Sequence, residues 1–235
     1  VIQMSPFKHF WEIRSKFPKN FSIFIPCCPF PDILGATKNC IPFSKKRPFS
    51  NSTSNEFNGL INGIDASSTS VIVSDYSLSG TIFREDTSTL DANFITAWET
   101  NFLLAEAAEK GFITTNSETL YNKAVAQAFD YWNTILPASY LTGNANFNAS
   151  GTTPLEQIIT QKWIASVING YEGWIEYRRT GFPALKNVSA SLNNGLIPVR
   201  MPYPAEAASL NSENYKVAET ATNGNSLDVK VWWNE

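Results

Sequence analysis

Residues 93–111 read NFITAWETNFLLAEAAEKG and carry the clearest structural signal in the chain. Apolar side chains recur there at steps of three to four residues, which places them on one face of an α-helix. They are Phe94, Ile95, Trp98, Phe102, Ala105 and Ala108. The run ends at Gly111, a residue type favoured just after a helix C-terminus. The pattern predicts a helix from Asn93 to about Gly111.

A second helical pattern follows after a short connection. It begins near Ser117, a residue type that caps helix N-termini, and Glu118 complements the positive end of the helix dipole. The apolar steps continue to about Ile135. Helices joined by so short a connection are usually antiparallel neighbours, so residues 93–135 are predicted to form a helical hairpin.

A second pair is predicted further along the chain. Thr153, Pro154 and Glu156 form the pattern of a capping box with proline at the first helical position, so a third helix begins there. Its apolar steps continue to Asn169-Gly170, and a fourth helical segment spans 171–179 and ends at Thr180-Gly181. Four helices packed as two antiparallel pairs are therefore expected over residues 93–179.

These pairs predict a mainly α fold of tetratricopeptide-like helical hairpins with long irregular loops, although the spacing departs from the repeat of about 34 residues. After Gly181 the prolines at 183, 198, 202 and 204 impose extended backbone on the residue before each. An extended C-terminal wrap is expected there. The chain ends near Trp232 and Trp233, two large aromatics that we expect to be docked on the core.

The composition is that of a globular protein. The 235 residues are 43% hydrophobic and 17% charged, with a formal net charge of −3, which counts against a phosphate-binding surface and hence against nucleic acid. No apolar run approaches the roughly 18 residues of a membrane-spanning helix. Residues 1–48 differ from the rest, with eight basic residues, two acidic residues and seven prolines. We expect a Pro/Phe/Lys-rich lead at 1–48 that contributes little to the core, and a helical domain at 49–235.

The sequence offers little for catalysis. The only histidine, His9, lies in the lead, and the three cysteines lack the spacing of a metal site or a disulfide framework. No catalytic residue, metal or cofactor is therefore predicted.

Carboxylates and arginines on the predicted helices allow two interpretations. Glu172 and Glu176 lie four apart, and Glu106 and Glu109 three apart, as a glycosidase pair would on one helix face. Such spacings are common. We therefore favour the interpretation that these glutamates are surface charges or partners of Arg178 and Arg179. The arginine pair itself would suit an anion clamp, but a structural network is favoured here too.

Six motifs lie in one order over residues 93–233. They read NFLLAEAA at 101–108, LEQIITQKW at 155–163, EGWIEYRRTGFP at 172–183, IPVRMPYP at 197–204, NSENY at 211–215 and KVWW at 230–233. Together they resemble the C-terminal half of the SusD/RagB family; the resemblance weakens back to about residue 49 and is absent from 1–48. Members are longer and begin with a signal peptide and a lipidated cysteine, so the chain resembles a fragment or a truncated product.

The resemblance implies that the protein binds a ligand and does not catalyse a reaction. Family members are non-enzymatic lipoproteins on the outer-membrane surface of Bacteroidetes, where they bind glycans or other nutrients and cover a SusC-like TonB-dependent transporter. It therefore implies an oligosaccharide or other nutrient as ligand, that transporter as partner, and a lipid anchor not visible in this chain. A helical scaffold that holds a partner protein without a small ligand is the alternative. A hydrolase is the second alternative.

Aromatic side chains are the candidate ligand contacts, because sugar rings pack their C–H groups on flat aromatic faces. Trp98, Trp132, Trp163 and Trp174 lie at apolar helical steps and are predicted to be core. Trp174, between glycine and the arginine pair, is predicted to be a structural anchor. Three aromatics in the polar 49–92 region are the predicted ligand-binding residues: Tyr76, Phe83 and Phe57.

Overall fold

The computed structural model describes residues 72–77, 83, 93–143, 145–185, 193 and 195–234. Its regular structure in these ranges is helical, without a strand. A short 3-10 helix, η2, spans Val73–Asp75. The α-helices whose bounds the structure describes are α4 (Ala97–Glu109), α5 (Ser117–Tyr131), α6 (Pro154–Ala165), α7 (Gly170–Thr180), α8 (Ala205–Leu210) and α9 (Ser212–Ala221). The predicted lead at 1–48 lies outside the described residues.

The four helices expected over 93–179 are present, but α4 begins later than predicted, and α5 begins at Ser117 as predicted with a different capping residue. Thr96 caps α4: its hydroxyl accepts from the Glu99 backbone N–H, and the Glu99 carboxylate accepts from the Thr96 N–H. This capping box fixes the start at Ala97, so the predicted start at Asn93 is wrong and Phe94 is fully exposed. Asn116, not Ser117, caps α5, while the Ser117 hydroxyl donates to the Ala105 carbonyl oxygen.

The remaining helix ends follow their local signals closely. The Thr153 hydroxyl accepts from the Glu156 N–H at 3.1 Å, with Pro154 in the first turn of α6, as predicted. Gly181 ends α7 in the left-handed conformation, with φ of 75°, which glycine adopts without steric cost. α5 ends at Tyr131, one turn earlier than the predicted Ile135.

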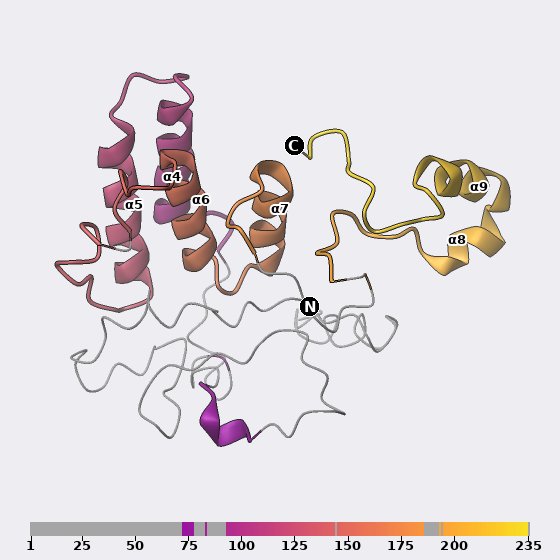
Figure 1. Ribbon diagram of the computed structural model, residues 1–235, viewed down its shortest axis with the longest axis horizontal. Helices are drawn as coiled ribbons and strands as arrows, with labels where there is room; N and C mark the ends of the chain where they lie inside the picture. The colour runs from indigo at the N-terminus through magenta and orange to yellow at the C-terminus, as the bar shows by residue number, and fades with distance from the viewer. Residues whose placement is uncertain are drawn as a thin grey trace, which may run out of the picture.

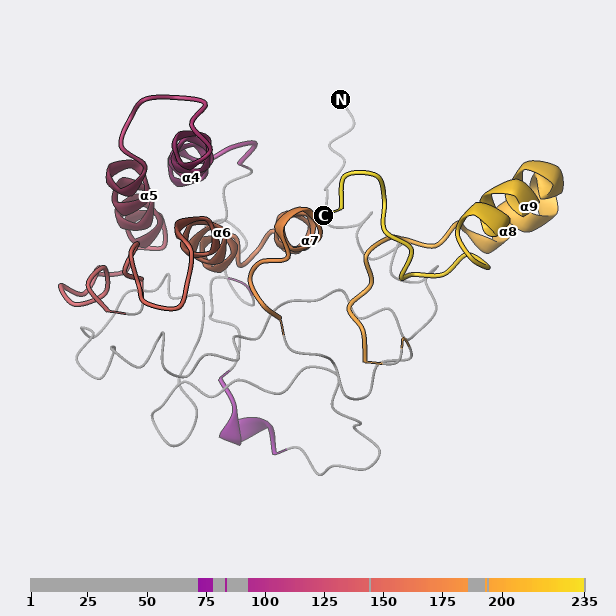
Figure 2. The same cartoon turned by 45° about the horizontal axis from the view of Figure 1, so that its top comes forward.

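Helices α4 to α7 pack against one another as a stack. α4 and α5 lie side by side, α6 packs against both, and α7 lies on the far side of α6 (Figures 1 and 2). The short connections make α4–α5 and α6–α7 antiparallel pairs. The core between them is dominated by large fully buried side chains: Phe102, Tyr121, Val125, Ile158 and Ile159.

The irregular segment between α5 and α6 also enters the core, which the sequence pattern does not indicate. Tyr140, Ala145 and Phe147 are buried in it. The Tyr121 hydroxyl donates to the Ala145 carbonyl oxygen at 2.8 Å, and the Tyr140 hydroxyl donates to Gln161 at 2.9 Å. These bonds satisfy the buried hydroxyls and fix the loop on α5 and α6.

The segment after α7 is only partly the extended wrap that the prolines predict. Residues 195–204 are free of regular helix, but α8 and α9 form a helical arm that bears no buried residue. The arm extends away from the α4–α7 stack (Figure 1). Its base is closed by the Arg200 guanidinium, which donates to the Ser226 carbonyl oxygen at 2.7 Å, and by Asn225, which accepts from the Tyr203 N–H at 2.8 Å.

In the described part of the chain, no helix is both long and apolar enough to span a bilayer. Among the same residues, no group of three or more His, Cys, Asp or Glu side chains has the arrangement of a metal site.

Candidate functional site

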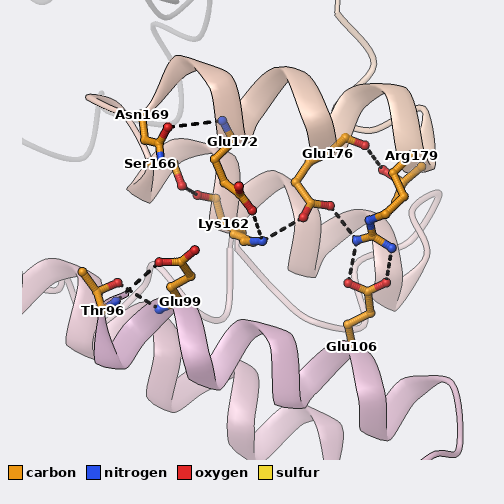
Figure 3. A network of polar contacts seen from close by, with 10 residues as sticks. Thr96, Glu99, Glu106, Lys162, Ser166, Asn169, Glu172, Glu176 and Arg179 are labelled. Atoms are coloured by element: carbon orange, nitrogen blue, oxygen red, sulfur yellow. Dashed lines mark hydrogen bonds and ion pairs between the residues drawn. The ribbon is translucent and has the colours of Figure 1, made fainter. Parts of the chain in front are cut away.

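A network of charged side chains joins α4, α6 and α7 (Figure 3). Its centre is Lys162 on α6, whose side chain is 2% exposed. The Lys162 ammonium donates to Glu172 and to Glu176, each at 2.7 Å. The two glutamates lie one turn apart on α7, so a single ammonium group binds both carboxylates that the sequence places on one helix face.

The network continues to α4 through Arg179. Its guanidinium donates to Glu176 at 2.6 Å and to both carboxylate oxygens of Glu106, one of them at 2.7 Å. The second contact is bidentate, the geometry in which an arginine binds a carboxylate most strongly. Lys110 adds a contact of 2.9 Å to Glu106 from its own helix. The favoured interpretation of Glu106 and Glu176 as partners of Arg179 is confirmed.

Neighbouring charges favour the ionised forms of Glu106, Lys162 and Arg179. Burial alone would raise the pKa of Glu106, but hydrogen bonds and charges from Arg179 and Lys110 outweigh burial and keep it below its ordinary value. Burial alone would lower the pKa of Lys162, but Glu176 and Glu172 raise it. The pKa of Arg179 is raised in the same way by Glu106 and Glu176, against burial. The arrangement ties three helices together, and each of its carboxylates, Glu106, Glu172 and Glu176, is bound by a lysine or an arginine.

Because Glu106 is part of this network, we expect the free energy of unfolding to depend on pH. Because the folded-state pKa of Glu106 lies below the ordinary value of 4.5, its contribution is present above about pH 4.5 and is lost as the pH falls through the folded pKa. We expect Glu106→Gln to lower the free energy of unfolding by about 1–2 kcal/mol at pH 7, since its neutral amide keeps a hydrogen bond but loses the charge. The gap between wild type and variant should close below pH 4.5 in urea titrations. Glu109→Gln, an exposed change on the same helix, is the control; a constant gap for Glu106→Gln would contradict this origin.

The outer side of α7 carries a stack of aromatic rings around Arg178. The Arg178 guanidinium lies 3.6 Å from the Trp174 ring centroid and 4.4 Å from that of Trp233. The same guanidinium donates to the Val199 carbonyl oxygen at 3.2 Å, and the Trp174 indole N–H donates to the Pro198 carbonyl oxygen at 2.6 Å. Cation–π contacts of this kind are stabilising where they are desolvated. Both arginines of the pair are engaged within the molecule, which favours the structural interpretation over an anion clamp.

Of the four predicted core tryptophans, Trp98, Trp132 and Trp163 are buried, and Trp174 is not fully buried. Trp174 is half-buried and joins α7 to the chain at residue 198. The predicted docking of the two C-terminal tryptophans holds for only one of them. Trp233 contacts Arg178, but Trp232 is 96% exposed, so the prediction is wrong for that residue.

The predicted ligand-binding aromatics have different surroundings. Tyr76 directly follows η2 and is half-buried. Phe83 is also half-buried and lies edge-to-face on the buried Trp132, with ring centroids 6.2 Å apart, so one edge of its ring already packs within the molecule. No ring contact joins Tyr76 to Phe83 among the described residues, and Phe57 lies outside them. Their role as ligand contacts stays a prediction.

Other exposed aromatics were not among the sequence-based candidates. Phe94 was assigned to a helix face and Trp232 to the core, whereas Phe112 lies in the turn between α4 and α5 and is 78% exposed. A closer reading of Thr96 and Glu99 as a capping box would have placed Phe94 outside the helix. No local signal distinguishes Trp232 from Trp233.

The stack of antiparallel helix pairs with an irregular connection defines a tetratricopeptide-like helical protein. The family model described as "Starch-binding associating with outer membrane", SusD-like, matches residues 36–204. The chain therefore belongs to this SusD-like family, as its motifs predicted.

Solved structures agree with this assignment. A chitin-binding protein is 31% identical, with a TM-score of 0.50 over 60% of this chain and 33% of its own. A SusD homologue from Bacteroides vulgatus is 28% identical, with a TM-score of 0.65 over 79% of this chain and 45% of its own. A chitin-binding SusD homologue from Flavobacterium johnsoniae is 24% identical, with a TM-score of 0.66 over 87% of this chain and 48% of its own.

This chain thus spans between a third and a half of the length of these structures. No match was found among the curated protein sequences.

Proposed function

We propose that this protein is a non-enzymatic glycan-binding component of an outer-membrane nutrient-uptake complex. The observation that carries the proposal is the match of residues 36–204 to a family described as starch-binding and associated with the outer membrane. The chitin-binding relative at 31% identity supports an oligosaccharide as ligand. The α4–α7 stack supplies the rigid support that a binding surface needs.

The absence of catalysis is part of the proposal. Of the four carboxylates whose spacing suits a glycosidase, Glu106, Glu172 and Glu176 are each bound to Lys162, Arg179 or Lys110, and Glu109 is exposed on α4. A glycosidase needs two carboxyl groups placed on either side of the glycosidic bond, whereas Glu106, Glu172 and Glu176 bind cationic side chains of the protein itself. Incubation with labelled chitohexaose and maltohexaose should therefore leave both oligosaccharides uncleaved, and any cleavage above a buffer control would contradict the proposal.

The proposed partner is a SusC-like TonB-dependent transporter, and the proposed location is the outer surface of the outer membrane, with attachment through a lipid anchor. The family resemblance supports all three. A transporter gene immediately upstream of the gene for this chain would favour the partner, and co-purification of the full-length protein with that transporter would test the contact directly.

Tyr76 provides the first binding prediction. We expect Tyr76→Ala to weaken binding of chitohexaose or maltohexaose by about 5- to 30-fold, the loss of roughly 1–2 kcal/mol from one aromatic contact, and to leave the melting temperature nearly unchanged. Calorimetric titration measures the first effect and thermal melting the second. Phe112→Ala removes another exposed aromatic and is the control. Binding that is unchanged in Tyr76→Ala would remove this residue from the site.

A protein-interaction scaffold is the second candidate function. The α8–α9 arm favours it, because neither helix buries a side chain and both Leu210 and Val217 are largely exposed. Exposed apolar side chains gathered on one element are typical of contact surfaces. Glycan titration of the wild-type chain separates the two functions, since a scaffold without a small ligand would bind neither oligosaccharide.

A further inference from the structure

The α8–α9 arm is closed on itself at its base. The Val199 N–H donates to the Leu227 carbonyl oxygen at 2.9 Å, which pairs the segment that enters the arm with the segment that leaves it. Asn225 binds both backbone groups of Tyr203: its amide oxygen accepts from the Tyr203 N–H at 2.8 Å, and its amide N–H donates to the Tyr203 carbonyl oxygen at 3.1 Å. The buried Arg200 guanidinium closes the same base. All of these bonds lie within the arm.

The arm is not attached by helix packing. Among the described helices, α8 and α9 contact each other and none of α4–α7. They lie away from the stack in both views (Figures 1 and 2). Within the described part of the chain, the arm is therefore joined to the stack through its two connecting segments, residues 195–204 and 222–234.

Both connecting segments meet α7 at Arg178. From the entering segment, the Val199 carbonyl oxygen accepts from the Arg178 guanidinium at 3.2 Å. From the leaving segment, the Trp233 ring centroid lies 4.4 Å from the guanidinium carbon. The ring centroid of Trp174, one turn earlier on α7, lies 3.6 Å from the same carbon. One planar cation thus contacts an indole of α7 and both segments of the arm.

Arg178 differs in this respect from Arg179. It is 9% exposed and, among the described residues, makes no ion pair, whereas Arg179 pairs with carboxylates of the stack. Its charge is balanced by the indole faces and by the Val199 carbonyl oxygen. The contacts of Arg178 therefore connect the arm to α7 and contribute nothing to the charge network of the stack.

The two connecting segments do not depend on Arg178 equally. The entering segment has further attachments, since Ile197 is buried and the Trp174 indole N–H donates to the Pro198 carbonyl oxygen at 2.6 Å. The leaving segment is held at α7 by the contact of Trp233 with Arg178. Removal of Arg178 would therefore change a two-point attachment of the arm into a one-point attachment.

We propose that Arg178 is the joint that sets the orientation of the α8–α9 arm, and that the arm turns as one closed unit when this joint is released. A hinge motion needs only a few connecting residues to change conformation, and residues 195–198 and 228–232 lie between the closed base and the joint. The bonds at the base need not break in such a motion. This inference is independent of glycan binding.

The orientation of the arm can be measured as a distance between two spin labels. The labels are placed on α4 at Glu109→Cys and on α9 at Lys216→Cys, both exposed, in the full chain with its three native cysteines changed to serine. We expect Arg178→Gln to widen the distance distribution about twofold. Arg178→Lys keeps the charge but loses the planar guanidinium, so its distribution should have an intermediate width. Lys123→Gln removes an exposed charge from α5 and is the control, which should leave the distribution unchanged.

Hydrogen exchange shows whether the arm stays closed in these variants. In Arg178→Gln the N–H groups of Val199 and Tyr203, both bonded within the base, should exchange as slowly as in wild type. Arg200→Gln removes a bond of the base itself and should speed exchange at both groups, which verifies that the measurement reports on closure.

Each outcome bears on the joint. A wider distribution with unchanged exchange at the base supports it. An unchanged distribution in both Arg178 variants overturns it, and so does faster exchange at Val199 and Tyr203 in Arg178→Gln, because the arm would then not be a closed unit. If Arg178→Gln loses its helical circular dichroism, Arg178→Lys decides by the same two measurements. None of these outcomes changes the proposed function, which glycan titration tests separately.

Discussion

Lys162→Met is expected to lower the free energy of unfolding by about 3–5 kcal/mol, because removal of one partner leaves buried charges without compensation. The Lys162 side chain is 2% exposed and that of Glu176 is 4% exposed, and water cannot replace the ammonium group between α6 and α7. Methionine keeps the apolar stem, so the loss reports on charge and not on packing. Such a loss is a large share of the 5–15 kcal/mol that stabilises a typical domain. Urea unfolding followed by circular dichroism measures it.

Lys110→Met is the matched control for this change. Lys110 contacts Glu106 from one turn away on the same helix, but its side chain is 39% exposed. Exposed ion pairs contribute about 0–1 kcal/mol, since water and salt screen them. A loss in Lys162→Met no larger than that in Lys110→Met would show that the buried network does not hold the helices together.

Gly173→Ala is expected to destabilise the protein by about 2–3 kcal/mol, although glycine to alanine inside a helix usually stabilises by about 0.5–1 kcal/mol. A Cβ atom at this position would lie 2.8 Å from Cδ1 and 3.0 Å from Nε1 of Trp163. Trp163 is itself buried, so either the indole or the α6–α7 spacing has to shift. Urea unfolding of the variant measures the loss.

A double-mutant cycle assigns the effect to this contact. Trp163→Leu removes the indole that the new methyl group would meet, and in that background Gly173→Ala should cost little or become favourable. The coupling should reach about 1–3 kcal/mol, the range for residues in direct contact. Additive effects of the two substitutions would place the strain elsewhere.

Much of the helical framework was predictable because its signals are local. Thr153 starts α6 by accepting a hydrogen bond from the Glu156 N–H within one turn, the fixed φ of Pro154 suits the first turn, and Gly181 ends α7 through its own backbone freedom. Even the error at Asn93 has a local remedy, since the capping box of Thr96 and Glu99 is visible in the chain. The arm was missed because its prolines at 202 and 204 indicate extended backbone, whereas α8 begins immediately after the second.

The candidate site was less predictable, because its contacts join residues far apart in the chain. The spacing of Glu176 and Arg179 indicates an ion pair, but the bidentate contact of Arg179 with Glu106 spans 73 residues. Lys162 lies among apolar positions of α6, and its burial follows only from the approach of two glutamates on α7.

Local sequence thus accounts for where helices begin and end, since hydrogen bonds within a turn and the period of apolar residues suffice for that. Tertiary packing determines which charged side chains are buried, which charges pair across helices and which of two adjacent aromatics remains in solvent. Trp232 and Trp233 make the point most directly: they are identical and adjacent, yet Arg178 on α7 holds one ring while the other is exposed. The reason is that the exposure of each ring depends on whether its side of the turn contacts a helix that is distant in the sequence.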